Sequence, residues 1–397
     1  MSTAVPAPGL PQLRAALGEL SARGLRRERL TVGGFAAGGA RVLTTAAGEL
    51  IDFSSNDYLG LARHPALAAA MAECAARCGA GSGASHLVTG HGAEHEALEA
   101  ELAAFTRRPR ALLFSTGYMA NLAVLTALAG PGQRVLLDRL SHASLIDGAR
   151  LSGAALRRFA HADPEAARRL ARTPFALLGT DGLFSMDGDL APLPALAQLA
   201  QAHGAWLAVD DAHGLGVLGA GGGGTLEHFG LTVREVPVLV GTLGKAFGSF
   251  GAFVAGEHDL IEFLLQRARP YIYTTALPQP VAAATRAALA LAVSEPWRRA
   301  QLAAHVQRFR ARAQAAGIPL LPSQSPIQPV VLGCAAAVLE AQRALAAAGY
   351  CVVAIRPPTV PPGSARLRVT LSAAHTGAQV EGLVQELARA CAQAGTA

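Results

Sequence analysis

From about residue 55 onward, short apolar segments alternate with longer segments that have helical periodicity. The apolar segments have the length of strands and cover residues 111–115, 134–137, 176–180, 206–209, 238–241 and 251–255. Helical patterns between several of them cover residues 93–105, 120–128 and 192–202. This alternation is typical of a mostly parallel sheet that helices cover on both faces. The sequence therefore predicts an α/β fold for the central part of the chain.

The two ends of the chain have patterns of their own. Residues 12–29 have the periodicity of an amphipathic helix, and two short strands, at residues 41–45 and 50–53, are expected to follow it. Ala-rich helical residues 279–316 lead into a smaller α/β or α+β part with further alternating strands and helices. We expect three parts: an N-terminal helix with short strands (1–54), a large domain (55–292) and a small C-terminal domain (293–397).

The composition argues against several classes of protein. With 397 residues, 51% of them apolar and 16% charged, the chain is suited to a large globular core. No apolar run approaches the ~18 residues of a membrane-spanning helix, and the first residues do not resemble a secretory signal. Five cysteines without metal-ligand spacing favour reduced thiols in a cytoplasmic protein and no metal site.

The formal net charge of +6 raises the question of nucleic-acid binding. The arginines include pairs at 157–158, 168–169 and 298–299, which we interpret as solvated helix faces and not as one basic stripe. An aromatic content of 5% is poor for base stacking, so we expect no nucleic-acid partner. A positive field would instead attract an anionic substrate such as a CoA thioester.

Lys245 is the only lysine in the chain, and it lies in the run GTLGKAFG. An ammonium group can lose its proton and become a nucleophile, whereas a guanidinium group cannot. The chemistry that follows is an imine with an aldehyde cofactor or with a carbonyl substrate. The alternative is an accident of composition in a chain rich in Ala, Arg and Gly. A P-loop does not fit, because Leu239 stands where that motif needs Gly and Ala246 where it needs Ser or Thr.

Another glycine motif, GxGxxG at residues 214–219, follows an expected strand. A dinucleotide-binding fingerprint requires a helix directly after it and an acidic residue about 20 positions further on. Here a glycine-rich stretch at 221–224 follows instead, and no acidic residue stands at the expected place. The motif is therefore interpreted as a turn, and a nicotinamide-dependent oxidoreductase is the weakest alternative.

Polar side chains at the ends of other strands fit pyridoxal 5′-phosphate (PLP). Asp210 ends an apolar strand, where a carboxylate can keep the pyridine nitrogen of PLP protonated. His213, three residues later, could bond the phenolic oxygen of PLP, while Asp211 is interpreted as a turn carboxylate. His142 follows another strand end and could stack on the cofactor ring.

A phosphate site is predicted where the strand at 111–115 meets the following helix. Residues 115–118 have the sequence STGY, and such a strand–Gly–helix junction presents backbone N–H groups and the positive end of the helix dipole. The hydroxyl of Thr242, three residues before the lysine, could add a hydrogen bond. Taken alone, an ordinary turn explains this junction equally well.

Together these segments resemble the α-oxoamine synthases, a family of fold-type-I PLP enzymes related in fold to aspartate aminotransferase. The resemblance extends over nearly the whole chain and rests on many motifs at compatible spacing. They are SNDYLGL, GSGASHLVTG, FSTGYMAN, DRLSHASL, FSMDGD, VDDAHGLGVLG, GTLGKAFG, YIYTT and AIRPPTVPPGSARLRVTLSAAH. The resemblance implies a large, mostly parallel seven-stranded sheet domain, a smaller C-terminal α/β domain and a homodimer.

The resemblance also implies roles for individual residues. Lys245 matches the Schiff-base lysine, Asp210 the partner of the pyridine nitrogen, His213 the residue beside the phenolic oxygen and His142 the residue that stacks on the ring. Further matches to cofactor contacts are Gly117, Tyr118, Ser185, Thr242 and, toward the cofactor of the other subunit, Thr275. Matches to substrate contacts are Asn56, His142 and Arg368 for the amino-acid carboxylate, then Arg26 and Thr359, with Arg356 as a weaker candidate. One departure is Asp181, which stands where the family pattern has Glu.

The activity implied is decarboxylative condensation of an amino acid with an acyl thioester. The runs SPIQPV (325–330) and AIRPPTVPP most resemble the branch that joins L-alanine to a pimeloyl thioester, carried on CoA or on an acyl carrier protein, in biotin biosynthesis. The nearest alternative is a sister enzyme that uses glycine and acetyl-CoA. A PLP lyase or aminotransferase on the same fold is less favoured, and a non-catalytic partner subunit would be expected to lack Lys245.

Overall fold

The computed structural model describes residues 9–35, 42–46 and 48–394. Their contacts form two compact units, one of residues 56–304 and the other of the described residues up to 55 together with those from 305 onward. Residues 293–304, which the sequence assigned to the C-terminal part, contact the larger unit.

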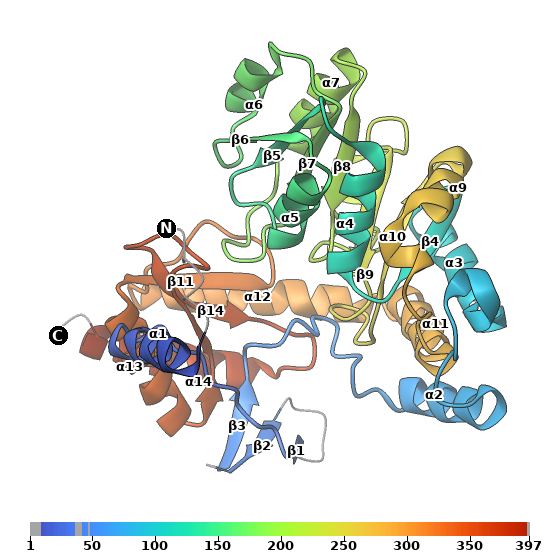
Figure 1. Cartoon of the computed structure of the whole chain (residues 1–397). Coiled ribbons are helices and arrows are strands. Elements are labelled where there is room, and N and C mark those ends of the chain that lie inside the picture. The colour runs from blue at the N-terminus through green and yellow to red at the C-terminus, as the bar shows by residue number, and fades with distance from the viewer. Residues whose placement is uncertain (1–8, 36–41, 47, 395–397) are drawn as a thin grey trace. The chain divides into compact units, whose positions relative to one another are not determined.

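The larger unit is built on one seven-stranded sheet (Figure 1). Its strands, in spatial order, are β4 (Arg110–Phe114), β10 (Ala252–Gly256), β9 (Val238–Thr242), β8 (Trp206–Asp210), β7 (Leu177–Asp181), β5 (Arg134–Asp138) and β6 (Ala155–Phe159). Strand β10 is antiparallel to both of its neighbours, and the pairs from β9 to β6 are parallel. The predicted α/β fold with a mostly parallel seven-stranded sheet is confirmed.

Two apolar cores lie on opposite faces of this sheet because side chains alternate along each strand. In β5, for example, Leu137 belongs to the core under α4 and α5, and Leu136 to the core under α6 and α7. The helices of this region are α2 (Pro65–Cys78), the π-helical turn η1 (His86–Gly90), α3 (Ala93–Phe105), α4 (Gly117–Leu128), α5 (Ala143–Leu151), α6 (Pro164–Ala171), α7 (Leu193–Ala202), α8 (Gly224–Phe229), α9 (His258–Arg267), α10 (Arg269–Ile272) and α11 (Gln279–Ser294).

The edge strand β6 did not follow from the sequence pattern. Its residues Arg157 and Arg158, interpreted above as part of a helix face, pair in register with Leu136 and Leu137 of β5. An edge strand exposes much of its surface and so carries a weak apolar pattern. The arginine pair therefore gives this strand a charged edge.

The expected helix 279–316 is two helices, α11 and α12 (Trp297–Ala315). Pro296 lies between them, and its ring cannot continue the helical hydrogen bonding. Arg298 was expected on a solvated face but is buried. Its guanidinium group donates to the Leu59 carbonyl at 3.0 Å and to Glu295 at 2.6 Å.

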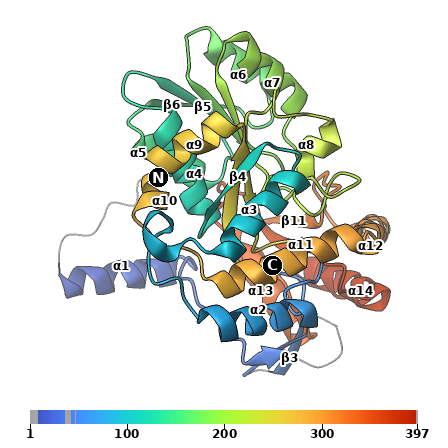
Figure 2. The same ribbon diagram turned by 90° about the vertical axis from the view of Figure 1, so that its right-hand side faces the viewer.

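The smaller unit contains two sheets. One has the order β1 (Gly34–Phe35), β2 (Val42–Thr45), β3 (Gly48–Asp52) and β12 (Tyr350–Cys351), and the other has the order β11 (Ile327–Gly333), β14 (Ala365–Thr370) and β13 (Val353–Ile355). Helices α13 (Ala335–Ala347) and α14 (Gly377–Ala394) follow the expected pattern (Figure 2). The first residue of the expected strand at 41–45 lies outside the described residues.

Helix α1 (Leu10–Ala22) is shorter than the expected 12–29. Gly24, with φ of 62°, adopts the left-handed conformation that commonly terminates a helix. Arg26 therefore lies beyond the helix and not on it. Among the described residues, no helix combines the length and hydropathy needed to cross a membrane.

A histidine ties together three segments at the carboxyl edge of the large sheet. His161 follows β6, and its Nδ1 lies 3.0 Å from Asp138 Oδ1 at the end of β5, while its Nε2 lies 2.8 Å from Asp189 Oδ2 in the loop after β7. Burial lowers the pKa of this imidazole, but hydrogen bonds and attraction to the two carboxylates outweigh it and raise the pKa to about 10. At neutral pH the ring is therefore a cation that donates from both nitrogens.

We expect His161→Ala to lower the free energy of unfolding by about 2–4 kcal/mol near neutral pH, because it leaves two carboxylates without their shared cation. A group whose pKa rises on folding contributes fully below its unfolded pKa and loses the contribution as pH rises through its folded pKa. The deficit should therefore shrink between pH 6.5 and about 10. Denaturant unfolding across that range, with exposed His258→Ala as the control, measures it; a pH-independent deficit contradicts the ion pair.

Candidate active site

The loop that follows β9 carries Lys245. Its half-buried ammonium group donates a hydrogen bond to Thr242 Oγ1 at 3.3 Å, and the Thr242 hydroxyl donates to the carbonyl of Ala212 at 3.3 Å. These bonds connect the end of β9 to the turn after β8. The lysine thus lies near the carboxyl ends of two neighbouring parallel strands, where α/β proteins commonly bind their ligands.

Asp210 is the last residue of β8 and is almost fully buried. Its Oδ2 accepts a hydrogen bond from Asn121 Nδ2 at 2.6 Å, and its Oδ1 accepts one from the backbone N–H of Ala212 at 3.0 Å. These two hydrogen bonds fix the plane of the carboxyl group. Asp210 is therefore held in one orientation at the edge of the sheet where the sequence led us to expect it.

The same asparagine connects Asp210 to His142. Asn121 Nδ2 also donates to Ser144 Oγ at 2.9 Å, and this hydroxyl lies 2.6 Å from His142 Nδ1. His142 is the N-cap of α5, and its Nδ1 accepts from the backbone N–H of Ser144 at 3.3 Å. Because Nδ1 is an acceptor, the neutral imidazole carries its proton on Nε2. The exposed ring is thus fixed in both orientation and tautomer.

His213 belongs to a second hydrogen-bonded group. Its Nδ1 lies 2.7 Å from the hydroxyl of Tyr58, and that hydroxyl donates to Asn56 Oδ1 at 3.2 Å. His213 and Tyr58 are both buried, and Asn56 is half-buried. The structure therefore brings together an expected cofactor residue and an expected substrate residue through a tyrosine that the sequence did not single out.

The start of α4 meets the end of β9. Thr116 caps the helix by accepting the backbone N–H of Met119 at 3.2 Å. At Gly117 a Cβ atom would lie 2.6 Å from Thr242 Cγ2, so only glycine allows this approach. Tyr118 is 44% exposed and donates to Asp147 at 2.6 Å. The first turn of α4 and the side chain of Thr242 are thus adjacent, as a phosphate site built from both requires.

The remaining expected cofactor contacts lie in loops. Ser185 is half-buried in the loop after β7, which an isolated bridge between Leu183 and Leu190 closes. Thr275 is exposed and forms an antiparallel bridge with Ser85, which precedes η1. The structure places both residues in the larger unit, and their roles stay predictions.

Three expected substrate contacts lie in the smaller unit. Arg368 is buried in β14, the central strand of its sheet, where it is in register with Pro329 and Val353. Arg26 and Thr359 are exposed. Arg356, the weaker candidate, donates to the carbonyl of Gly24. That leaves Arg368 as the one arginine of this group that is held within a sheet.

Asp211 is a buried structural carboxylate. It accepts the backbone N–H of Thr225 at 2.7 Å. A Cβ atom at Gly182, Gly214 or Gly224 would lie 2.8 Å or less from its oxygens, so its carboxyl group fills the centre of the glycine-rich turn. Burial raises the pKa of Asp211 to about 8. The GxGxxG segment therefore forms a turn around this group, as predicted, and no helix follows it directly.

A cluster of three histidines lies around η1. His86, His91 and His95 lie close enough to share a metal ion, but His86 Nδ1 and His91 Nδ1 are 2.8 Å apart and His95 accepts from Gly92 at 2.9 Å. These nitrogens are already engaged in hydrogen bonds. The cluster therefore supports the local structure around η1 and is not needed for the chemistry of Lys245.

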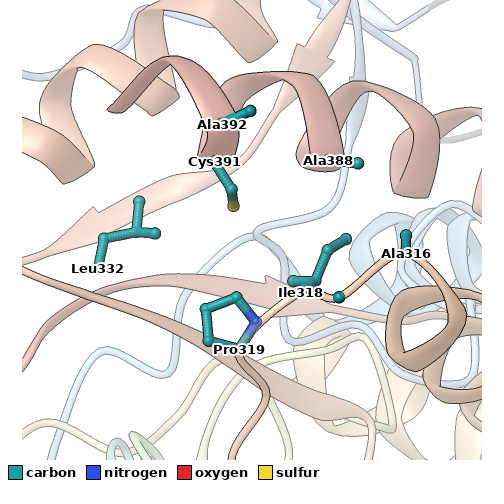
Figure 3. Close-up of a pocket in the computed structure, with 8 residues that line it drawn as sticks. Ala316, Ile318, Pro319, Leu332, Ala388, Cys391 and Ala392 are labelled. Atoms are coloured by element: carbon teal, nitrogen blue, oxygen red, sulfur yellow. The ribbon is translucent and has the colours of Figure 1, made fainter. Parts of the chain in front are cut away.

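A hollow of about 290 Å³ in the smaller unit is lined mainly by Ala, Ile, Leu and Pro side chains (Figure 3). Cys391 is its one lining side chain with a reactive atom, and burial raises the pKa of this thiol. A raised pKa makes the thiol a poorer nucleophile at neutral pH. This hollow is therefore not the catalytic site.

The comparisons with known proteins agree with this geometry. The family model described as aminotransferase class I and II matches residues 48–387. An 8-amino-7-oxononanoate synthase of Methylococcus capsulatus is 59% identical over 96% of this chain and 98% of its own length. A protein of the same name from Cellvibrio japonicus is 61% identical over 84% of this chain and 85% of its own.

Solved structures show the same likeness. Serine palmitoyltransferase from S. paucimobilis has a TM-score of 0.91 at 31% identity and covers 97% of this chain and 98% of that one. An 8-amino-7-oxononanoate synthase from Francisella tularensis has a TM-score of 0.76 at 32% identity and covers 86% and 97%. The chain therefore belongs to the class I and II aminotransferase family of PLP-dependent enzymes. Within that family, its relatives near 60% identity are 8-amino-7-oxononanoate synthases.

The residues of the larger unit fit PLP. Asp210 offers a carboxylate for the ring nitrogen, Lys245 an amine for the aldehyde, and the first turn of α4 backbone N–H groups for the phosphate. Gly117 leaves open the space that a Cβ would fill beside Thr242. The expected cofactor and the expectation of an enzyme are confirmed by the family.

Sequence reasoning missed three residues of the site: Asn121, Ser144 and Tyr58. Each lies inside a motif that was recognised, FSTGYMAN, DRLSHASL and SNDYLGL. Asn121 is a polar residue on an otherwise apolar stretch of α4, and its burial is the signal that could have identified it. Its partner Asp210 is 89 residues away in the chain, which no local pattern reveals.

We expect Asn121→Ala to raise the apparent Kd for PLP roughly 10- to 100-fold, since a hydrogen bond to a charged group contributes about 1.5–3 kcal/mol. Titration of cofactor-free protein with PLP measures this. Thr126→Ala is the matched control, because Thr126 lies on the same helix and its hydroxyl donates only within it, to Leu122 at 2.6 Å and Ala123 at 3.5 Å. Equal effects of the two changes would remove Asn121 from the site.

Proposed function

We propose that this enzyme condenses L-alanine with a pimeloyl thioester to give 8-amino-7-oxononanoate, CO2 and a free thiol, in biotin biosynthesis. The observation that carries the proposal is the position of Lys245, the only lysine of the chain, hydrogen-bonded to Thr242 beside the turn that follows Asp210. Relatives near 60% identity that are named for this reaction support the choice of product.

The proposal extends to partners and location. The thiol carrier is CoA or an acyl carrier protein, and the enzyme acts as a homodimer in which Thr275 reaches the cofactor of the other subunit. All five cysteines are free thiols, which accords with a reducing cytoplasm. The net charge of +6 favours the approach of an anionic acyl donor.

Binding and orientation of the amino acid come first. Arg368 and Asn56 hold the carboxylate of alanine, with Arg26 and Thr359 as further substrate contacts. His142 would cover one face of the cofactor ring, and the hydrogen bonds from Ser144 fix the plane of its imidazole for this role. A fixed carboxylate sets the direction of the Cα–H bond, and orientation of this kind supplies a large part of a rate enhancement.

In the proposed reaction, Asp210 and Lys245 are the residues that hold or move protons. PLP, when bound, supplies an electron sink for negative charge at the α-carbon of the amino acid. Asp210 would hold the proton on the ring nitrogen, and His213 would bond the phenolic oxygen. Lys245 Nζ takes the proton from Cα, a bond then forms from Cα to the thioester carbonyl carbon, and the thiolate leaves. The carboxylate next departs as CO2, and a proton returns to Cα from Lys245.

A second candidate is another condensation of the same family. The structural likeness to serine palmitoyltransferase, with a TM-score of 0.91, favours it, whereas the 59–61% identity to 8-amino-7-oxononanoate synthases favours the first candidate. The same residues would act in both. The two differ in amino acid and acyl chain, so only the substrates distinguish them.

Thiol release from PLP-loaded protein tests the substrates directly. We expect release with pimeloyl-CoA and L-alanine, and none with acetyl-CoA and glycine or with palmitoyl-CoA and serine. Release with another pair only would assign the enzyme to that branch. If CoA substrates all fail, pimeloyl-acyl carrier protein is the remaining donor of the proposed reaction, and no release with it would overturn the proposal.

Lys245→Ala is expected to abolish turnover and the absorbance of the imine between protein and PLP. Lys245→Arg is the matched variant, because it keeps the positive charge and removes the nucleophilic amine. Both should be inactive, as measured by thiol release and by the visible spectrum. Turnover at a normal rate in either variant would contradict the role of the amine.

Arg368→Ala should chiefly raise the KM for alanine, with a smaller loss of kcat through misorientation. Loss of one charged hydrogen bond corresponds to roughly 10- to 100-fold in KM. Arg356→Ala serves for comparison, since that arginine bonds a backbone carbonyl of the same unit. An unchanged dependence on alanine concentration would exclude Arg368 from carboxylate binding.

A further inference from the structure

Two carboxyl groups lie side by side at the active edge of the sheet. Asp181 ends β7 and Asp210 ends β8, and the two residues are direct partners in the parallel ladder. Neighbouring strands lie about 4.8 Å apart, and residues in register present their side chains to the same face. Asp181 is 7% exposed and Asp210 is 6% exposed, so water screens neither of them well.

The two groups differ in their hydrogen bonds. Asp210 accepts from the Asn121 side chain and from the backbone N–H of Ala212. Asp181 accepts from one donor in the described part of the chain, the backbone N–H of His142, at 2.8 Å from its Oδ2. Donors stabilise the ionised form, and like charges at this separation disfavour double ionisation. If one of the two carries a proton, it is therefore Asp181.

We propose that Asp181 is protonated in the folded enzyme at neutral pH and acts as an uncharged positioning residue, holding the His142 backbone while Asp210 remains the only anion of the pair. One oxygen of the neutral carboxyl group still accepts the N–H of His142. The N-cap of α5, and with it the imidazole plane, is then set without placing a second negative charge beside Asp210. This inference rests on the proposed function in assigning His142 and Asp210 to the cofactor.

The surroundings of Asp181 support this state. Burial raises its pKa well above the ordinary value, and the negative charges of Asp210 on β8 and Asp138 on β5 raise it further. The N–H of His142 at the start of α5 and the positive charge of Lys245 after β9 lower the pKa, but by less than burial and the charge of Asp210 raise it. These are the groups that face Asp181 from the elements packed around it.

The protonation state also gives a reason why aspartate is tolerated at this position, where the family pattern has Glu. A neutral side chain needs one acceptor oxygen near the His142 N–H, and the short side chain at the end of β7 supplies it at 2.8 Å. An amide would meet the same requirement. Asparagine is therefore the substitution that preserves the contact while removing the titration.

Infrared spectra of PLP-loaded protein labelled with ¹³C-aspartate test the proposal. At pH 7 we expect the C=O stretch of a protonated carboxylic acid, reduced in Asp181→Asn. Asp211, whose pKa burial raises to about 8, contributes to the same region, so Asp211→Asn identifies that share. The exposed Asp259→Asn is the control and should leave the band intact. A band that Asp181→Asn does not reduce would overturn the proposal.

Thermal unfolding as a function of pH gives a second, independent measurement. A carboxyl group whose pKa rises on folding makes the folded state lose stability as pH rises above its unfolded pKa. Asp181→Asn lacks this titration. The melting temperature of the variant minus that of the wild type should therefore increase as pH rises above about 4. A difference that does not change with pH would contradict the inference. If wild-type protein releases no thiol yet shows both signatures, the proposed function fails and this inference stands.

Discussion

The hydrogen bonds of Asn121 organise the large unit of this enzyme at its functional edge. One side-chain nitrogen donates to Asp210 at the end of β8 and to Ser144 in the first turn of α5. The carboxyl group proposed for the cofactor nitrogen and the histidine proposed to cover the ring are therefore connected through one donor on α4. Since α4 also begins at Gly117, beside Thr242, a single helix connects the residues proposed for the ring with those proposed for the phosphate.

The parallel arrangement of the strands places several carboxyl groups close together at one edge of the sheet. Parallel strands end at one edge, so Asp138, Asp181 and Asp210 come together there as the last residues of β5, β7 and β8. Each meets a different partner: the His161 cation, a backbone N–H, and a side-chain amide with a backbone N–H. The different partners allow neighbouring carboxyl groups of one chemical type to hold different charges.

The sequence was informative where a residue's role depends on its own strand or turn. The buried central strands have continuous apolar runs, and Asp210, His142 and Lys245 each follow one within a few residues, so their gathering at one edge could be predicted. Strand β6 was not predicted, because an edge strand needs few apolar residues. Asn121 and Tyr58 were missed because Asp210 and His213, with which they form hydrogen bonds, lie 89 and 155 residues away in the chain. Ser144 was missed because its hydrogen bond to Asn121 joins two different helices and forms only on folding. The roles of Arg26, Thr359 and Arg368 still rest on the family resemblance.

The restriction of side-chain amines to one position has a chemical consequence. Thioesters acylate free amines without enzymatic help, whereas guanidinium groups stay protonated and do not react. Apart from Lys245, every residue counted among the lysines and arginines of the chain is an arginine. The one lysine is half-buried beside Thr242. A thioester donor of the kind proposed would therefore meet no side-chain amine in this chain other than the one proposed to act in catalysis.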